Sequence, residues 1–135
     1  MPFQTETVVR FAQVDAAGIV FYPRYFEMLN AAVEDWFAAM DLDFATMHRD
    51  RDMGVPTVKL EASFLAPSEL GDRLTVSITP QEIGRSSCTL TAVFACAGHE
   101  RLRIVVVLVC MDLSARRSMA WPDELRPKMV RYREA

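Results

Sequence analysis

The chain has 135 residues, a length that suits one domain, residues 1–135, around a single hydrophobic core. Hydrophobic residues make up 51% and charged residues 24% of the sequence, and the net charge is −3. This balance argues against general attraction to nucleic acid or membranes, so any phosphate-bearing ligand must be bound by a local basic cluster. No stretch approaches the roughly 20 apolar residues of a transmembrane helix, and no signal-peptide segment is recognisable.

The three cysteines, Cys88, Cys96 and Cys110, are odd in number and show no Cys-x-x-Cys spacing. We expect reduced thiols packed in a sheet, because free cysteine is usually a buried residue. The expected location is therefore the cytoplasm.

The first third of the chain predicts a strand, a turn and a long helix. Residues 5–13 alternate enough to form a strand, and a small-residue turn at 15–18 interrupts it. From Pro23, which suits a first helical position, to about Met40 the period becomes helical. Trp36 and several alanines make the other helical faces apolar too, so we expect substantial burial. Five large apolar residues of this helix recur at spacings of three and four, which places them on one face: Phe26, Leu29, Val33, Phe37 and Met40.

Strands dominate the remainder, after a short polar helix at 43–50. β-Branched residues and turn residues predict strands at 55–66, 72–83, 85–97 and 101–113, with a closing helix at 122–129. Residues 104–111 are apolar at every position, which predicts burial on both faces, by the helix and by a second subunit. A long apolar helix followed by antiparallel strands predicts an α+β fold, with the sheet wrapped around the central helix.

The segment that carries chemistry is residues 15–26, Asp-Ala-Ala-Gly-Ile-Val-Phe-Tyr-Pro-Arg-Tyr-Phe. It places Asp15 just before a buried helix, whose N-terminus has unsatisfied N–H groups and about half a positive charge. A carbonyl oxygen bound there would be polarised, and an oxyanion would be stabilised. Pro23 has no N–H, so the amide of Tyr22 or Phe21 is the expected donor. Asp15 is close enough in sequence to reach the same carbonyl carbon.

Thioester hydrolysis needs little more than these two groups. A thiol ionises at about pH 8.5, so it leaves without a strong general acid. The alternative is that Asp15 only closes an Asx turn ahead of the helix.

The same segment resembles the signature of the 4-hydroxybenzoyl-CoA thioesterase family, a hotdog-fold group. The family pattern is roughly Asp-x-x-Gly-Ile-Val-aromatic-aromatic-Pro-x-Tyr. The likeness extends along the chain, because residues 54–56 and 62–64 resemble the second strand and residues 85–87 the turn into the fourth. The residues that match the signature are Asp15, Gly18, Ile19, Val20, Phe21, Tyr22, Pro23 and Tyr25.

The resemblance implies a hotdog fold and hydrolysis of an acyl-CoA to a free acid and CoA. By this resemblance, Asp15 is the nucleophile or general base, and the backbone amide of Tyr22 binds the thioester oxygen. Gly18 and Phe21 become substrate-binding positions. Independently of the resemblance, the sequence has no Gly-rich phosphate loop, no dinucleotide fingerprint and no metal-ligand histidine spacing, so we expect neither a cofactor nor a metal. Ala16 departs from the family, which often has proline there, but this change removes no chemistry.

Two further departures concern the acyl group. The family members specific for 4-hydroxybenzoyl-CoA bind the ring hydroxyl with an aspartate and a threonine, whose positions match Asn30 and Val55. Asn30 can still hydrogen-bond but carries no charge, and the Val55 side chain cannot hydrogen-bond. These changes weigh against a 4-hydroxyl preference and leave an aryl group, such as benzoyl or hydroxybenzoyl, or a medium-sized acyl group. Asn30 could alternatively make polar contacts at a subunit interface.

For the CoA phosphates, the resemblance points to two regions rich in arginine and serine. Arginine is suited to phosphate because its planar fork binds bidentately. Arg101, Arg103, Arg126 and Lys128 are interpreted as solvated surface charges. The predicted CoA-binding residues are Arg85, Ser86, Ser87, Arg116 and Arg117.

Two rival functions remain open. The substrate could be a fatty acyl group, short or medium in length, carried by CoA or by acyl carrier protein. The chain could instead bind acyl-CoA without turning it over. A hotdog dehydratase is disfavoured because neither His48 nor His99 is suitably placed, and the absent G-x-S-x-G motif disfavours an α/β-hydrolase.

An unpaired edge strand predicts a homodimer or homotetramer, and the resemblance places the active sites at subunit interfaces.

Overall fold

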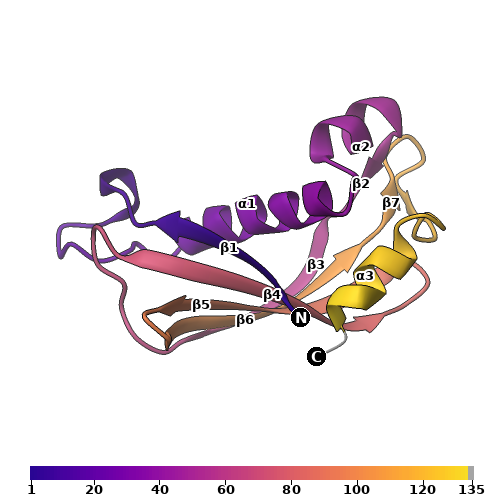
Figure 1. The fold of residues 1–135 in the computed structure, drawn as a ribbon. Coiled ribbons are helices and arrows are strands. Elements are labelled where there is room, and N and C mark those ends of the chain that lie inside the picture. The colour runs from indigo at the N-terminus through magenta and orange to yellow at the C-terminus, as the bar shows by residue number, and fades with distance from the viewer. Residues whose placement is uncertain (134–135) are drawn as a thin grey trace.

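The computed structural model describes residues 1–133. Five strands form one antiparallel sheet in the order β1-β4-β5-β6-β3, and a three-stranded sheet has the order β2-β7-β8. The long helix α1 lies across one face of the larger sheet, which curves around it (Figure 1). The helices are α1 (Arg24–Ala39), α2 (Phe44–Asp50) and α3 (Arg126–Arg133), with a 3-10 turn at Phe11–Gln13. The strands are β1 (Phe3–Val8), β2 (Met53–Gly54), β3 (Thr57–Phe64), β4 (Arg73–Ile83), β5 (Ser87–Cys96), β6 (His99–Val109), β7 (Met111–Asp112) and β8 (Arg117–Ser118).

This is the predicted α+β hotdog architecture. The predicted helix begins and ends within one residue of α1, and most of its predicted apolar face is buried, with Phe37 fully inaccessible. Trp36 extends this buried face, but Ala31, Ala38 and Ala39 are exposed. The predicted substantial burial therefore holds for the face that packs on the sheet, while the other face is open in the protomer.

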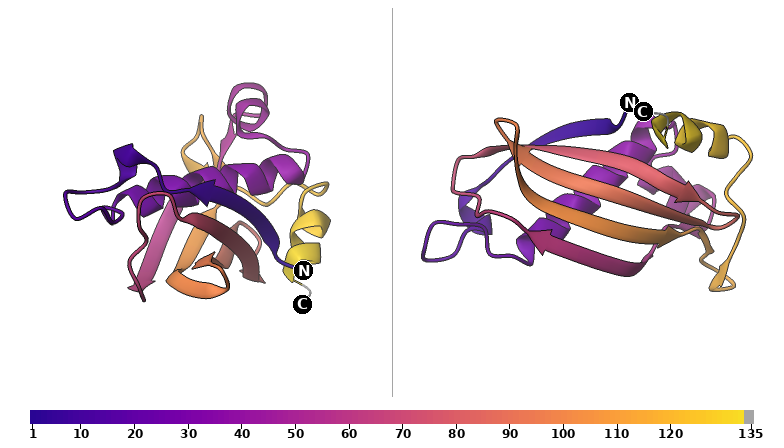
Figure 2. Two further views of the ribbon diagram at one scale, coloured as in Figure 1. Left: turned by 60° about the vertical axis from the view of Figure 1, so that its left-hand side comes forward. Right: turned by 90° about the horizontal axis from the view of Figure 1, so that it is seen from below.

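β6 is covered on the α1 side as predicted, and the predicted cover of its other face by a second subunit stays a prediction. Its side chains alternate, with Ile104 and Val106 buried against α1 while Val105 is 38% exposed on the opposite face. Antiparallel pairing gives a strand one inward and one outward face, so the apolar run does not produce burial on both sides within one protomer. Figure 2 shows this outer face of the sheet uncovered from below.

The remaining strand predictions are correct in place but too long, and proline and turn chemistry explains most of the difference. The first strand ends at Val8, and residues 11–13 form a 3-10 turn instead. Pro56 has no N–H, and it separates β2 from β3. The 101–113 segment is interrupted at Cys110, whose N–H donates to the Ser86 carbonyl at 2.7 Å.

The C-terminal helix begins later than predicted. Residues 122–125 form a turn, in which the N–H groups of Leu125 and Arg126 donate to the Pro122 carbonyl. Pro127 sits in the first turn of α3, where its missing N–H costs no helical hydrogen bond. In the short helix α2, Asp43 caps the N-terminus by accepting a hydrogen bond from the Thr46 N–H at 3.2 Å.

The cysteines are unpaired thiols, as expected. Cys88 and Cys110 are buried in or beside the sheet, and burial raises their pKa values to about 12 and about 11. Cys96 is half-buried near the end of β5. Within residues 1–133, no helix is long and apolar enough to span a membrane.

Candidate active site

The Asp15 loop, residues 14–22, precedes the N-terminus of α1. The Asp15 N–H donates to the Ile19 carbonyl at 3.0 Å, and the Gly18 N–H donates to the Asp15 carbonyl at 3.0 Å. Gly18 has φ +79°, a left-handed conformation that glycine adopts without strain. Asp15 Oδ1 accepts a hydrogen bond from the Ala17 N–H at 2.8 Å, so the Asx turn exists. Asp15 is exposed, and within residues 1–133 its Oδ2 has no partner.

The hydrogen bonds of this loop distinguish the two candidate amides at the start of α1. The Phe21 N–H donates to the Gln13 carbonyl at 2.9 Å, so it is not available to a ligand. The Tyr22 N–H has no acceptor in the described part of the chain, and Pro23 already has helical dihedral angles. Tyr22 therefore presents the free amide at the positive end of α1, beside the loop that carries Asp15.

A second loop, residues 66–72, supports the Asp15 loop from behind. The Val20 N–H donates to the Ser68 carbonyl at 2.9 Å, and the Leu70 N–H donates to the Gly18 carbonyl at 3.1 Å. Arg101 on β6 fixes this supporting loop: its guanidinium donates to the Pro67 carbonyl at 2.8 Å and to Asp72 Oδ2 at 2.9 Å. The interpretation of Arg101 as a solvated charge is wrong, because only 19% of its side chain is exposed.

The Asp72–Arg101 pair makes a testable contribution to stability. The hydrogen bond from the Glu69 N–H, and then Arg101, lower the pKa of Asp72. A lowered native-state pKa stabilises the fold at neutral pH, and that stability is lost as the pH falls through the native-state pKa. We expect Asp72→Asn to lower the free energy of unfolding by about 1 kcal/mol at pH 7.

Denaturant unfolding at several pH values measures this effect. The difference between wild type and Asp72→Asn should shrink as the pH falls below about 4, where the unfolded aspartate protonates. Asp35→Asn, at an exposed site on α1, is the control. A deficit that persists unchanged at acid pH would contradict the ionic origin.

Apolar side chains surround the free Tyr22 amide. A shallow pocket of about 300 Å³ lies between the start of α1 and the end of β3. The Tyr22 and Phe64 rings meet edge to face with their centroids 6.0 Å apart, and Phe64 remains 52% exposed. Phe21 is 49% exposed beside them. The pocket is lined by Ile19, Val20, Tyr22, Tyr25, Phe64, Leu65, Ala66 and Pro67.

A larger cavity of about 510 Å³ lies further along α1, and both Asn30 and Val55 line it. Its walls come from α1, α2, the β2–β3 linker and β6, and most of them are apolar. Sequence reasoning missed Glu34, which lines the cavity one helical turn after Asn30. The i to i+4 spacing from Asn30 was the signal that could have found it. The lining residues are Leu29, Asn30, Val33, Glu34, Phe44, Val55, Pro56, Thr57, Val106 and Leu108.

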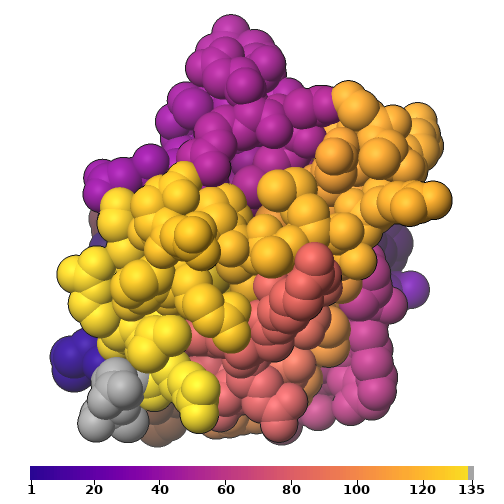
Figure 3. Space-filling view, turned by 90° about the vertical axis from the view of Figure 1, so that its right-hand side faces the viewer, coloured from indigo at the N-terminus to yellow at the C-terminus, as the bar shows by residue number. Residues whose placement is uncertain are grey.

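The five predicted CoA-binding residues lie together, at the opposite end of α1 from Asp15 (Figure 1). Arg85 and Ser86 are in the β4–β5 turn and Ser87 begins β5, while Arg116 and Arg117 are in the β7–β8 hairpin. Their backbones are linked through the 119–121 segment. Its Trp121 N–H donates to the Arg85 carbonyl at 3.0 Å, and the Trp121 indole N–H donates to the Ser87 carbonyl at 2.9 Å. Figure 3 shows the β4–β5 turn, the hairpin and the C-terminal segment meeting on this end of the molecule.

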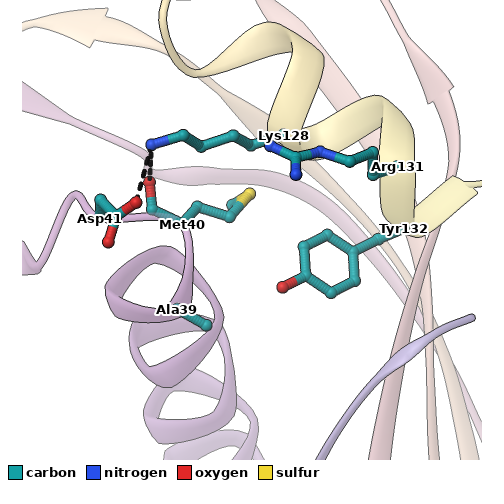
Figure 4. Close-up of a pocket in the computed structure, with 6 residues that line it drawn as sticks. All are labelled: Ala39, Met40, Asp41, Lys128, Arg131 and Tyr132. Carbon is teal, nitrogen blue, oxygen red and sulfur yellow. Dashed lines mark hydrogen bonds and ion pairs between the residues drawn. The ribbon is translucent and has the colours of Figure 1, made fainter.

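A third pocket lies between the C-terminus of α1 and α3 (Figure 4). Lys128 donates to the Met40 carbonyl at 3.2 Å and to Asp41 Oδ2 at 2.9 Å, and these contacts lower the pKa of Asp41. A lysine bound to the last carbonyl groups of a helix is a structural cap. The interpretation of Lys128 as solvated is therefore wrong.

The other two arginines interpreted as solvated charges also have partners. Arg126 donates to the carbonyl groups of Ile83 and Gly84, and it is not a solvated charge. Arg103 pairs with Glu100, although both side chains are substantially exposed. Residues 1–133 contain no group of three or more ligand-type side chains that could hold a metal ion.

Comparison with known proteins identifies the family. The model of the thioesterase-like superfamily matches residues 9–129, which is most of the chain. The chain belongs to this superfamily. A 1,4-dihydroxy-2-naphthoyl-CoA hydrolase of Thermosynechococcus vestitus is 31% identical over 121 residues, covering 89% of this chain and 83% of the relative. The corresponding hydrolase of Nostoc punctiforme is 29% identical over 125 residues, covering 93% of this chain and 84% of the relative.

Solved structures show the same fold. The 1,4-dihydroxy-2-naphthoyl-CoA thioesterase of Synechocystis superposes with a TM-score of 0.87 at 24% identity, covering 96% of both chains. A Staphylococcus aureus protein solved in complex with CoA superposes with a TM-score of 0.92 at 16% identity, covering 99% of this chain and 85% of that chain. The protein is a hotdog-fold thioesterase that acts on acyl-CoA.

Proposed function

We propose that this thioesterase hydrolyses an aryl-CoA, with Asp15 as its catalytic carboxylate and the Tyr22 amide as its oxyanion donor. The observation that carries the proposal is the pairing of a free carboxylate oxygen with a free helix N-terminal amide at the start of α1. An amide at that position stabilises the negative charge that develops on the thioester oxygen, which is a large term in acyl transfer.

Two chemical courses are compatible with this pair. If Asp15 attacks the carbonyl carbon, the C–S bond breaks, CoA leaves as a thiolate, and water then hydrolyses the mixed anhydride. If Asp15 acts as a general base, it takes a proton from water, which attacks the carbonyl carbon directly. Both courses give the free acid and CoA.

An aryl group suits the large cavity and is the acyl class named for both sequence relatives. The walls of the cavity are mostly apolar, and its volume of about 510 Å³ accommodates a ring system. Both hydrolases compared above are named for 1,4-dihydroxy-2-naphthoyl-CoA, a bicyclic aryl thioester. We therefore favour hydroxylated aryl-CoA over fatty acyl-CoA as the substrate.

The complete site requires two subunits. Within one protomer, α1 is 16 residues or about 24 Å long, and it separates the Asp15 loop from the predicted CoA-binding residues. β3 is a sheet edge with exposed side chains on the α1 face, Leu60 at 37% and Phe64 at 52%. Unpaired apolar edges favour association.

Pairing of two β3 strands about a twofold axis would cover the exposed strand edge. It would also bring the Asp15 loop of one subunit close to the cavity of the other. The Phe64 end of β3 contacts Tyr22, and the Thr57 end lines the large cavity. Because a twofold axis pairs the strands in antiparallel order, each Tyr22 would then lie beside the cavity of the other subunit. We propose a homodimer of this kind, alone or within a tetramer, with the acyl group in one subunit's cavity and Asp15 from the other.

Arg117 tests the proposed CoA end of the site. It lies on β8, a few residues before Trp121, whose N–H donates to the Arg85 carbonyl in the β4–β5 turn, and its guanidinium suits a phosphate. We expect Arg117→Ala to raise KM for CoA thioesters several-fold, as expected for the loss of one charged contact, with a smaller effect on kcat. An unchanged KM would remove Arg117 from the site, and Arg103→Ala, on the outer sheet face, is the matched control.

A panel of thioesters tests the proposed substrate class. Release of free thiol should be fastest, in kcat/KM, for hydroxybenzoyl- and 1,4-dihydroxy-2-naphthoyl-CoA, and slower for octanoyl- and palmitoyl-CoA. A preference for the fatty acyl groups would overturn the aryl assignment. Turnover confined to acyl carrier protein thioesters would overturn CoA as the carrier.

A further inference from the structure

The large cavity along α1 has an uneven distribution of polar groups. Its α1 wall carries the side chains of Asn30 and Glu34, which are one helical turn apart on the same face. Neither side chain has a hydrogen bond or ion pair among residues 1–133. Among residues 1–133, Glu34 is the only charged residue that lines the cavity.

Glu34 differs from the nearby acidic residues of α1 because it lines the cavity and has no partner in the described part of the chain. Glu27 is held by an ion pair with Arg24 at 3.1 Å, and neither residue lines the cavity. Asp35 is exposed and lies outside the cavity lining. In the described part of the chain, no lysine, arginine or histidine lines the cavity to neutralise the Glu34 carboxylate. Glu34 is exposed to solvent in the protomer, so a ligand that fills the cavity would replace water as the partner of its carboxylate.

We propose that Glu34 is a specificity-determining residue that accepts a hydrogen bond from a hydroxyl group on the aryl ring of the substrate. This inference rests on the proposed aryl-CoA hydrolysis and names its substrate class: neutral rings that carry at least one hydroxyl group. It also assigns Glu34 the exclusion of acyl groups that end in a carboxylate.

The hydrogen-bonding capacities of Glu34, Asn30 and Val55 explain why Glu34 is assigned to the ring hydroxyl. An ionised carboxylate only accepts hydrogen bonds, whereas the Asn30 amide both donates and accepts. Val55 on the opposite element offers no side-chain hydrogen bond. A ring hydroxyl is a donor that satisfies Glu34, and a bare ring leaves a charged acceptor desolvated without a partner, which is costly. A carboxylate on the ring would face Glu34 as a like charge.

Two pairs of substrates test the two parts of the inference, each by a ratio of kcat/KM values. The first pair is 1,4-dihydroxy-2-naphthoyl-CoA and 2-naphthoyl-CoA, which differ only in the hydroxyl groups. The second is 4-carboxybenzoyl-CoA and 4-methylbenzoyl-CoA, which differ in charge. A ratio cancels any loss of correctly folded enzyme, so a merely structural defect would not change it.

The two variants at position 34 have distinct expected results. Glu34→Leu should lower the preference for the hydroxylated ring at least about tenfold, as expected for the loss of a hydrogen bond to a charged acceptor. Glu34→Gln retains an acceptor oxygen and should lower that preference less. It should raise the relative rate on the carboxylated substrate at least about tenfold, because removal of one charge ends the repulsion.

Asp35→Asn is the matched control, because it removes a neighbouring carboxylate of the same helix that does not line the cavity. Both ratios should stay at their wild-type values in this variant. Ratios that also stay within about twofold of wild type in both Glu34 variants would overturn the role of Glu34 while leaving the thioesterase proposal intact. Failure of the wild-type enzyme to hydrolyse any of the aryl-CoA substrates would overturn both.

Discussion

Replacement of Asp15 by asparagine is expected to lower kcat for the preferred aryl-CoA by at least about a hundredfold, in line with the usual contribution of a catalytic acid or base. Asparagine keeps an oxygen that can accept the Ala17 N–H, so the Asx turn and the loop should persist. What the variant loses is the charge on the second oxygen, which either attacks the thioester or takes a proton from water. Stopped-flow measurement of thiol release under single-turnover conditions isolates this chemical step.

The melting temperature and oligomeric state of Asp15→Asn should match those of the wild type. This result separates the chemical role of Asp15 from its role in the turn. Near-normal turnover in this variant would mean that Asp15 only shapes the loop, and the assignment of the catalytic carboxylate would be wrong.

The second large effect is expected at the β3 edge. Leu60 lies at the middle of this strand, on the α1 side, and is 37% exposed in the protomer. Leu60→Arg would place a charge in the proposed dimer contact, where it has no partner. We expect dissociation into folded monomers and a loss of at least about a hundredfold in kcat/KM, because each site would lose the half supplied by the other subunit.

Light scattering at micromolar concentration measures the dissociation, and the thiol-release assay measures the loss of activity. Glu6→Arg is the matched control, because Glu6 is exposed on β1, the opposite edge of the same sheet. It should remain dimeric and active. An active monomer of Leu60→Arg would contradict the shared site.

The loop before α1 shows how far the sequence alone could predict the site. Asp15 and the free amide at the helix start were predictable, because an acidic turn directly before a buried, proline-initiated helix has few arrangements. The choice of Tyr22 over Phe21 was left open by these residues. It depends on the hydrogen bond from Phe21 to the Gln13 carbonyl, which forms because residues 11–13 make a 3-10 turn rather than continuing the strand.

The basic side chains show where sequence reasoning fails. Arg101 and Arg126 bind carbonyl groups about 34 and 42 residues away in sequence, at Pro67 and Gly84. No local pattern encodes such contacts, which depend on how the strands bring distant loops together. The apolar run of β6 has a similar limit, since it carries no period that reveals which face packs on α1.

The direct test of the shared site is complementation between two inactive variants. Asp15→Asn removes the catalytic carboxylate, and Asn30→Trp fills the cavity from an exposed position on α1. After equal amounts are unfolded together and refolded, random pairing makes half of the dimers mixed, and each mixed dimer regains one complete site. Thiol release from 1,4-dihydroxy-2-naphthoyl-CoA should then recover to about a quarter of the wild-type rate. A mixture that contains mixed dimers yet stays as inactive as its parents would contradict a site built from Asp15 of one subunit and the cavity of the other.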